Sequence, residues 1–569
     1  MSKERQLFRC TKDGRYIKCS LPWHNPLSFI EHWARIKPSR PAIISHLHNN
    51  SLLLKCNWSE LLRHCLILAE QLKTLPFERF GIVSGSHITT IKTIIATLLA
   101  NKEFTIIDLL RTPKTIQFYK LFNSNVRAII IPAFEEMSDL LIDTVNEIRE
   151  NHENIEIISV GKNILASKNL SVSAKHKYKK LTNINYNEDM WNKPATLIYS
   201  PGHHHKPVGF FYTTRSIYAN MLAVAERFKF SPQTRFLLAG EIDSCYGLIP
   251  VLAVLLTGGT VILCDNIEAN NFWHIIEKNN INTARIMPRL IEALSSENSD
   301  SAYYRKSTLK YAIISGNYLP RRAGLRFYET FDIPLLQCYG TAETGGYILG
   351  PAPGLCNRFY ELSLRDDIVG EEFRFCNIKL MSDEKIQSAF TSTEQVGLIH
   401  IRGYTVSCGY WTGTELKLWN KAWLETSDLA CKIMFWDTPC YQIKGRAEDA
   451  LFINGKIIWP TNIEQPLLAT FPFLTDCIAT TVTDNQNRNI LSIIAIVSSD
   501  VPEERRSELL ALMQARITAG GVAGLIEEAT PDSIVMIEQN KLPRRYDNQI
   551  DREELKTQML KQIRGLAAS

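Results

Sequence analysis

The sequence predicts an α/β fold in which a mostly parallel sheet is covered by helices. Short apolar runs typical of strands alternate along the chain with longer patterns typical of helices. Parallel strands need a crossover, usually a helix, to return the chain to the same end of the sheet, so this alternation favours parallel pairing. A chain of 569 residues with 45% apolar content also exceeds the usual size of one hydrophobic core. At least two domains are therefore expected.

The expected elements follow one another in a regular order. A helix is expected over 58–75, and buried strands are expected over 128–131, 155–158, 195–199, 236–239, 260–264 and 311–314. The most apolar stretch, 249–263, contains Gly258 and Gly259 and is shorter than a membrane span. We therefore expect a buried helix followed by a strand in this stretch.

After residue 445 the pattern changes to a compact α+β unit. A strand is expected over 490–497, a helix over 503–517 and a second strand over 533–537. The expected fold is thus a large N-terminal domain of mixed, mostly parallel sheets with flanking helices, residues 1–444, plus a small C-terminal domain, residues 445–569.

Composition argues against several function classes. The formal net charge is +5, from 64 Lys and Arg against 59 Asp and Glu, and no long basic run is present, so nucleic-acid binding has little support. The 13 cysteines are odd in number and include no C-x-x-C pair, which argues against a disulfide framework and a zinc ribbon. The N-terminus lacks the order of a secretion signal. A cytoplasmic protein without a membrane span is expected.

One segment has the residues of a metal-phosphate site. The apolar run 333–336 predicts a strand, and the segment 338–346 after it combines a glycine turn with the single carboxylate of Glu343. Mg²⁺ is usually held by one or two protein carboxylates, because substrate phosphates and water supply its other ligands. Alone, the segment is equally typical of a surface loop.

Two further segments occur in the same order and spacing as in a known family. They are Thr426-Ser427-Asp428-Leu429 and Gly445-Arg446-Ala447-Glu448-Asp449. The chain resembles the adenylate-forming superfamily, which includes acyl- and aryl-CoA synthetases, firefly luciferase and the adenylation domains of peptide synthetases. The resemblance extends from about residue 26 to residue 552 and implies that residues 445–569 form a mobile lid, which rotates about Glu448 between half-reactions.

The resemblance also implies roles for three charged residues. Glu343 would hold Mg²⁺, Asp428 would accept hydrogen bonds from both ribose hydroxyls, and Arg446 would help to hold the ribose or a phosphate. An ionised acid is a strong paired acceptor and a guanidinium is a permanent planar donor, so these residue types suit the roles. The alternatives are a cap or turn acid for Asp428 and a surface ion pair for Arg446.

Two segments are implied to contact the adenine. The small residues Ser315-Gly316-Asn317 would let the backbone approach the base closely, because glycine has no side chain. Tyr339, which precedes Gly340, would stack on the base. A plain turn at 315–317 and a core tyrosine at 339 fit the same residues.

The phosphate loop departs from the family pattern. The family loop is rich in Ser, Thr and Gly and ends in Pro-Lys-Gly, whereas this chain has Val208 in place of the lysine. Pro201 removes an amide donor and His205 replaces a glycine. The nucleotide-binding positions expected in this loop are Ser200, Gly202, His203, His204 and Lys206. Adjacent histidines on an extended loop point in different directions, which argues against a metal site there. Two interpretations of these histidines remain: one protonated imidazole binds an anion, or the loop is simply solvated.

A second departure lies near the C-terminus. The segment 542–552 matches a family motif in which a lysine contacts the carboxylate substrate and the α-phosphate during adenylation, but Gln549 occupies that position. A neutral amide cannot supply the positive charge that stabilises the developing phosphoryl charge. Losing one such donor typically costs roughly 3 to 4 kcal/mol in the transition state.

The acyl pocket is expected where the apolar helix begins. In the resembled family this helix lines the pocket, and the matching positions here are Asp243, Ser244, Tyr246 and Gly247. Asp243 either anchors an amine on the substrate or caps the helix.

Three functions are compatible with these residues. The first is an AMP-forming ligase that uses ATP and Mg²⁺ to activate a small carboxylic or amino acid for transfer to coenzyme A or to the phosphopantetheine thiol of an acyl or peptidyl carrier protein. The second is a pseudoenzyme that binds a nucleotide, an acyl-adenylate or a partner protein. The third accepts a ready-made adenylate or thioester and performs only the transfer.

Overall fold

The computed structural model describes most of the chain. The described residues are 6–10, 16–20, 26–49, 51–85, 87–110, 112–172, 188–200, 207–295, 307–316, 319–382, 395–435, 437–453, 456–483, 489–497, 501–523, 525, 531, 533–543, 554–555 and 557–558.

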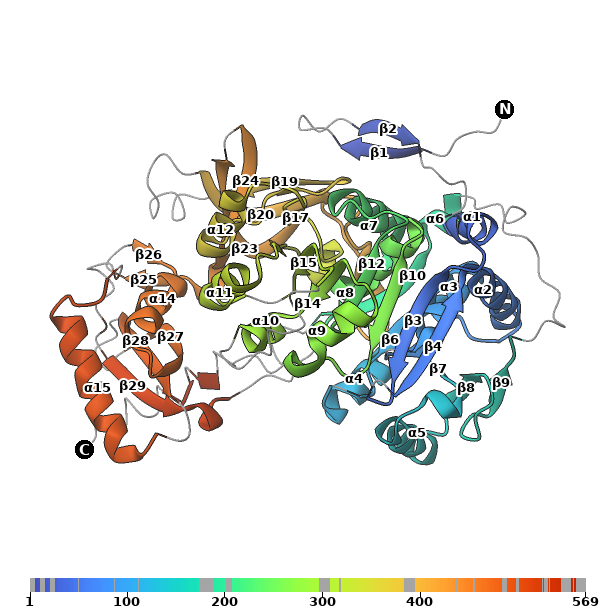
Figure 1. The fold of residues 1–569 in the computed structure, drawn as a ribbon, viewed down its shortest axis with the longest axis horizontal. Coiled ribbons are helices and arrows are strands. Elements are labelled where there is room, and N and C mark those ends of the chain that lie inside the picture. The colour runs from blue at the N-terminus through green and yellow to red at the C-terminus, as the bar shows by residue number, and fades with distance from the viewer. Residues whose placement is uncertain are drawn as a thin grey trace. The chain divides into compact units, whose positions relative to one another are not determined.

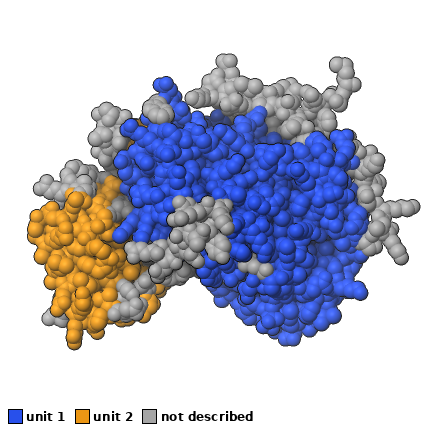
Figure 2. Space-filling view, in the orientation of Figure 1, with its two compact units in different colours: residues 1–378, 401–424, 434–442 blue, residues 379–400, 425–433, 443–569 orange. Residues whose placement is uncertain are grey.

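The chain forms two compact units, coloured separately in Figure 2. The first unit comprises residues 1–378, 401–424 and 434–442, and the second comprises 379–400, 425–433 and 443–569. The second unit thus takes in chain that precedes residue 445. The functional division into a core, 1–444, and a lid, 445–569, stays a prediction.

A nine-stranded mixed sheet belongs to the first unit (Figure 1). Its strands, in spatial order, are β22 (Leu416–Leu418), β21 (Gly409–Trp411), β11 (Gly209–Thr213), β10 (Pro194–Tyr199), β6 (Glu103–Ile107), β5 (Arg79–Val83), β7 (Ala128–Ile131), β8 (Glu156–Val160) and β9 (Lys168–Leu170). In this spatial order, all neighbouring strands from β10 through β6, β5, β7 and β8 to β9 are parallel. The neighbours from β22 through β21 and β11 to β10 are antiparallel.

A seven-stranded sheet completes the frame of the first unit. Its order is β16 (Leu335–Gln337), β15 (Tyr311–Ile314), β14 (Thr283–Ile286), β12 (Arg235–Ala239), β13 (Thr260–Cys264), β3 (Pro41–Leu47) and β4 (Leu52–Asn57). All neighbours are parallel except β3 and β4. The prediction of a mostly parallel α/β fold is therefore confirmed.

Helices connect and cover these strands. They are α1 (Ser28–Ile36), α2 (Trp58–Lys73), α3 (Ile88–Leu99), α4 (Lys114–Asn123), α5 (Asp139–Asn151), α6 (Glu188–Asn192), α7 (Thr214–Arg227), α8 (Cys245–Leu256), α9 (Ala269–Lys278), α10 (Pro288–Leu294), α11 (Arg321–Phe331) and α12 (Asn357–Asp366). Helix α3 contacts strands of both sheets, and α7 packs along α8. Helix α8 is apolar on all sides and almost wholly buried, which is typical of a helix inside a large core.

Local sequence explains where the predicted helix at 58–75 begins. The Asn57 side chain accepts a hydrogen bond from the Glu60 amide, and the Glu60 carboxylate accepts one from the Asn57 amide. This reciprocal cap satisfies two amides that the first helical turn leaves unpaired. Helix α2 therefore starts at Trp58, and it ends at Lys73.

Shorter elements complete the first unit. They are the hairpin β1 (Gln6–Cys10) and β2 (Tyr16–Ser20), the pair β17 (Leu349–Gly350) and β18 (Glu371–Glu372), and the 3₁₀ turns η1 (Phe134–Glu136) and η4 (Ala342–Thr344). The unit boundaries fall within the strands of a four-stranded sheet, β19 (Cys376–Met381), β20 (Gln395–Gly403), β23 (Leu424–Phe435) and β24 (Thr438–Arg446). In the described part of the chain, no helix combines the length and the hydrophobicity that crossing a bilayer requires.

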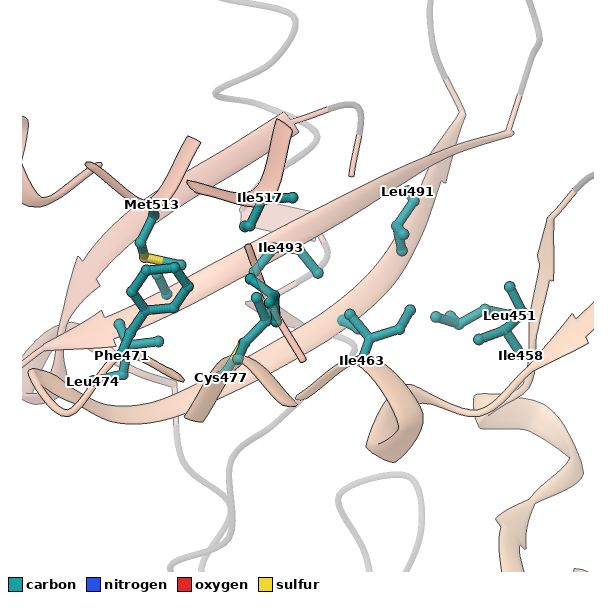
Figure 3. Close-up of a cluster of buried hydrophobic side chains, with 14 of the residues drawn as sticks. Leu451, Ile458, Ile463, Phe471, Leu474, Cys477, Leu491, Ile493, Met513 and Ile517 are labelled. Atoms are coloured by element: carbon teal, nitrogen blue, oxygen red, sulfur yellow. The ribbon is translucent and has the colours of Figure 1, made fainter. Parts of the chain in front are cut away.

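The second unit has its own hydrophobic core (Figure 3). Its elements are η5 (Ala447–Asp449), β25 (Leu451–Ile453), β26 (Lys456–Ile458), α14 (Pro460–Thr470), β27 (Leu474–Thr483), β28 (Asn489–Val497), α15 (Glu503–Thr518), β29 (Ser533–Glu538) and η7 (Gln539–Lys541). Met513 and Ile517 of α15 lie in one buried cluster with Ile493 of β28 and Cys477 of β27. The strands and the helix predicted at 490–497, 503–517 and 533–537 are all present.

Candidate functional site

Four neighbouring parallel strands end at one edge of the seven-stranded sheet. Strands β12, β14, β15 and β16 pair in register, so their carboxyl ends lie side by side. The segments that leave this edge are 240–247, 287–288, 315–316 and 338–346, and three of them hold predicted site residues. In open α/β sheets, ligands bind outside the carboxyl ends of the strands. We take this edge as the candidate site of the first unit.

Glu343 lies in η4, the turn that follows β16. Hydrogen bonds hold the backbone on both sides of it: the Tyr212 hydroxyl donates to the Ala342 carbonyl, and it accepts from the Gly345 amide at 2.8 Å. The Glu343 carbonyl itself accepts from the Ser407 amide at 2.9 Å. The predicted turn after a strand is therefore present, and contacts distant in sequence fix its backbone.

Hydrogen bonds join the other predicted segments at this edge. The Tyr246 hydroxyl donates to the Gly340 carbonyl at 2.6 Å, and the Tyr347 hydroxyl donates to the Tyr246 carbonyl at 2.8 Å. Ser315 Oγ bonds the Tyr347 hydroxyl at 3.0 Å. Ser315, Tyr246 and Gly340, which are far apart in sequence, thus meet in one network.

Close backbone approach explains two glycines of the site. Gly316 has φ +92° and lies against the ring of Tyr246, where an added Cβ would lie 3.2 Å from a ring carbon. At Gly340 a Cβ would lie 2.2 Å from the Gly346 carbonyl oxygen. Gly316 is exposed and Tyr339 is half-buried, so both remain candidates for contact with a base.

The capping alternative for Asp243 is wrong. The N-cap residue of α8 is Ser244, and its side chain makes no capping bond. Asp243 Oδ2 instead accepts a hydrogen bond from Lys120 Nζ of α4 at 3.2 Å, and the side chains are 9% and 7% exposed. A buried cation 123 residues away in sequence therefore binds Asp243, which local capping preferences did not indicate. Gly247, in the first turn of α8, packs against the Glu241 carbonyl.

The predicted phosphate loop lies between two antiparallel strands of the nine-stranded sheet. Ser200 follows β10 and Val208 precedes β11; the Ser200 amide donates to the Val208 carbonyl at 2.8 Å. Ser200 is buried, whereas the Val208 side chain is 39% exposed. The predicted positions between them, Gly202, His203, His204 and Lys206, lie outside the described residues, as do Asn317 and Gln549.

In the second unit, the structure brings two predicted residues together. Arg446 Nε lies 3.9 Å from Asp428 Oδ1, and the side chains are 34% and 16% exposed. The Asp428 amide donates to Thr426 Oγ1, which donates to the Ile399 carbonyl at 2.9 Å. Glu448, the predicted hinge, lies in η5 directly after β24. The acid and the guanidinium are thus neighbours on adjacent strands, which fits both a shared ligand and the alternative of an ion pair for Arg446.

Electrostatics argue against a nucleophilic cysteine at the site of the first unit. Burial, reinforced by the charge of Glu343, raises the pKa of the Cys245 thiol to about 12. Burial likewise raises the pKa of Tyr212, whose hydroxyl holds the Glu343 turn. Both groups are therefore protonated at neutral pH, and the thiol is a poor nucleophile.

The described residues could hold Mg²⁺ only if substrate phosphates supply part of its ligands. Among them, no three His, Cys, Asp or Glu side chains are grouped closely enough to hold a metal ion. Mg²⁺ in phosphate sites takes one or two carboxylates and completes its shell with phosphate oxygens and water. The half-buried Glu343 on its fixed turn fits that single-carboxylate role.

Sequence reasoning missed four residues that shape this site. Tyr212 and Tyr347 hold its backbone, Lys120 pairs with Asp243, and Arg285 lies fully buried at the end of β14. The first three carried no local signal, because their partners are distant in sequence. Arg285 did carry one, as a lone cation in the apolar strand Thr283–Ile286.

Known proteins resemble this chain in sequence and fold. The 2-succinylbenzoate–CoA ligase of Bacillus pumilus is 23% identical over 370 residues, which is 64% of this chain and 69% of the relative. The anthranilate CoA ligase AuaEII in complex with anthranoyl-AMP superposes with a TM-score of 0.72, at 17% identity, over 94% of this chain and 98% of that one.

A second solved structure carries a nucleotide and a metal. The O-succinylbenzoate coenzyme A synthetase of Bacillus subtilis in complex with ATP and a magnesium ion superposes with a TM-score of 0.69, at 18% identity, over 93% of this chain and 99% of that one. At such low identity these superpositions show the shared fold. The sequence model that describes AMP-binding enzymes matches residues 30–411, and the chain therefore belongs to the AMP-binding enzyme family.

Proposed function

We propose that the protein is an AMP-forming acid ligase that converts a small carboxylic acid to an acyl-adenylate and transfers the acyl group to coenzyme A. The observation that carries the proposal is the convergence, at the carboxyl edge of β12, β14, β15 and β16, of the Glu343 turn, the Ser315–Gly316 segment and the start of α8. The named relatives are CoA ligases of carboxylic acids, and the two solved structures among them hold anthranoyl-AMP in one case and ATP with Mg²⁺ in the other.

In the proposed complex, each group of residues has one task. Ser315, Gly316 and Asn317 face the adenine, with Tyr339 on the base; Asp428 accepts hydrogen bonds from the ribose hydroxyls, and Arg446 donates to the ribose or a phosphate. The start of α8, with Ser244, Tyr246 and Gly247, borders the acid. Residues 445–569 act as a lid with its hinge near Glu448.

The reaction has two balanced steps. An oxygen of the acid's carboxylate attacks the α-phosphorus of ATP, an acyl–phosphate bond forms, and pyrophosphate leaves. A thiolate then attacks the acyl carbon, a thioester forms, and AMP leaves. Mg²⁺ held by Glu343 would neutralise phosphate charge in the first step. The residues of this chain orient the two substrates and exclude water.

We further propose that the first step is slow. The chain has Val208 and Gln549 where the family has lysines, and Val208 leaves an exposed apolar side chain at the base of the phosphate loop. Each missing preorganised donor is expected to lower the rate by roughly two to three orders of magnitude. Lys206 and a protonated histidine of the loop are the local cations that would offset part of this loss.

The exposed Val208 also favours a second candidate. A protein that binds nucleotide, or accepts a ready-made adenylate or thioester and performs only the transfer, needs no phosphate-loop lysine. In that case the acceptor would be coenzyme A or the phosphopantetheine thiol of a carrier protein.

Pyrophosphate exchange separates these candidates. Wild-type protein with ATP, Mg²⁺ and a panel of small acids is expected to incorporate labelled pyrophosphate into ATP slowly but above an acid-free control. The double variant Val208→Lys plus Gln549→Lys should accelerate the exchange at least about a hundredfold. If neither protein catalyses exchange while AMP still raises the melting temperature, the result supports a protein that only binds nucleotide or only performs the transfer. If AMP has no effect on the melting temperature, the family activity is refuted for this chain.

A further inference from the structure

A fully buried cation, for which the described residues supply no ion-pair partner, lies at the candidate site of the first unit. Arg285, at the end of β14, is 2% exposed, and its Nη2 donates to the Ser315 carbonyl at 3.2 Å. Its Nε and Nη1 atoms are buried and have no hydrogen-bond partner, and in the described part of the chain Arg285 forms no ion pair. Burying an unpaired charge is costly, so a guanidinium in this state needs an explanation.

A glycine leaves room for the guanidinium, and two neighbouring titratable groups do not neutralise it. A Cβ atom at position 240 would lie only 2.0 Å from Arg285 Nη1, so the glycine there makes space for the charged group. The Cys245 thiol and the Tyr347 hydroxyl lie close enough to sense its charge, and Cys245 also senses the charge of Glu343. Burial raises the pKa of both groups, that of Cys245 to about 12, so neither carries a negative charge at neutral pH.

The position of Arg285 relates it to the proposed substrates. It lies at the end of the strand between β12 and β15, and those neighbouring strands lead into the start of α8 and into Ser315–Gly316. A Cβ atom added at Gly316 would lie 3.5 Å from Arg285 Nη2. A planar guanidinium donates two parallel hydrogen bonds to a carboxylate or sulfonate through Nη2 together with either Nε or Nη1. Nη2 has a second N–H besides the one that the Ser315 carbonyl accepts, and Nε and Nη1 are both unused.

We propose that Arg285 binds a second acidic group of the acyl substrate, so that the preferred acid carries a carboxylate or sulfonate besides the carboxylate that is activated. This inference rests on the proposed function and names its substrate class. The anion replaces the missing counterion, and two charge-assisted hydrogen bonds hold the far end of the acid. Because Nε and Nη1 have no contact with solvent, a neighbouring side chain moves when the acid enters.

Matched pairs of acids test this proposal without any variant. Glutarate and pentanoate, or isophthalate and 3-methylbenzoate, differ mainly in the second carboxylate. In calorimetric titrations with AMP present, we expect at least one dicarboxylate to bind about 10- to 100-fold more tightly than its monocarboxylate partner. Equal affinities within every pair overturn the proposal, while binding of AMP in the same titrations leaves the proposed function intact. Absence of AMP binding refutes both.

Substitutions then identify the residue responsible. Arg285→Met should abolish the preference for dicarboxylates and Arg285→Lys should retain part of it, whereas Arg289→Met, which removes a 74% exposed guanidinium from the same segment, should leave it unchanged. Because the methionine removes an unpaired buried charge, the ligand-free Arg285→Met protein should also melt at a higher temperature than the wild type.

Two results contradict this assignment. If Arg285→Met weakens the binding of AMP as strongly as the binding of the dicarboxylate, the guanidinium binds a nucleotide phosphate rather than the acid. If Arg285→Met melts at a lower temperature and the dicarboxylate preference survives in Arg285→Lys and Arg285→Met alike, the residue is only structural.

Discussion

The ion pair between Lys120 and Asp243 gives the sharpest stability prediction. Its atoms lie 3.2 Å apart and its side chains are 7% and 9% exposed, so both charges have left water. Replacing Asp243 by asparagine keeps the shape of the side chain but leaves the Lys120 ammonium buried without a counterion. Breaking a buried pair in this way typically costs about 3–5 kcal/mol of folding free energy.

An exposed ion pair provides the matched control. Lys73 and Glu70 lie 2.7 Å apart on α2, but both side chains are 38% exposed. Glu70→Gln should therefore cost no more than about 0.5 kcal/mol, because water screens the exposed charges. The contrast between Asp243→Asn and Glu70→Gln isolates the effect of burial from the effect of distance.

Urea unfolding followed by tryptophan fluorescence measures both variants. The chain has 10 tryptophans, and all but Trp459 belong to the first unit, so the signal reports mainly on the unit that holds the pair. The double variant Lys120→Met plus Asp243→Asn should be clearly less destabilised than the sum of its single variants, because it leaves no unpaired charge. A loss below about 1 kcal/mol for Asp243→Asn, or strict additivity, would refute the buried pair.

Three further predictions concern buried polar groups. Tyr212→Phe leaves the Ala342 carbonyl and the Gly345 amide without their partner and should cost about 1–3 kcal/mol in urea unfolding, while an unchanged free energy would show that the hydroxyl does not hold the turn. Burial lowers the pKa of His87 to about 4, so the folded state binds a proton at His87 less readily than the unfolded state does. This group therefore contributes up to about 3 kcal/mol of folding stability, which is complete above pH 6.5 and should be lost as the pH falls towards 4. The variant His87→Gln should lose less stability over the same pH range. The raised pKa of Cys245 predicts that iodoacetamide at pH 8 modifies the exposed Cys356 much faster than Cys245 in the folded protein, and equal rates in peptide mass analysis would contradict that burial.

The sequence was sufficient for most of the architecture because the local pattern and the tertiary fold agree. Apolar runs of strand length became buried strands such as β7, β12 and β15, and the glycine-rich turn with Glu343 follows β16 as expected. Buried parallel strands have a continuous apolar sequence, which makes them recognisable without knowledge of their neighbours.

The parts that could not be predicted depend on contacts between distant residues. Asp243 precedes a helix and has the residue type of a cap, but a lysine of another helix binds it. Tyr212 could not be connected to the Glu343 turn, since the two are 130 residues apart in sequence and only the fold brings them together. Local preferences describe one segment at a time, whereas such pairs are set by how the sheets pack.

The central claim is that the chain binds an adenosine nucleotide through Asp428. Calorimetric titration of the protein with ATP in the presence of Mg²⁺ tests this claim most directly. The wild type is expected to bind one nucleotide, Asp428→Asn should bind it at least about tenfold more weakly, and the exposed Asp437→Asn should match the wild type. Absence of saturable binding by the wild type, or equal affinities for all three proteins, would contradict the account.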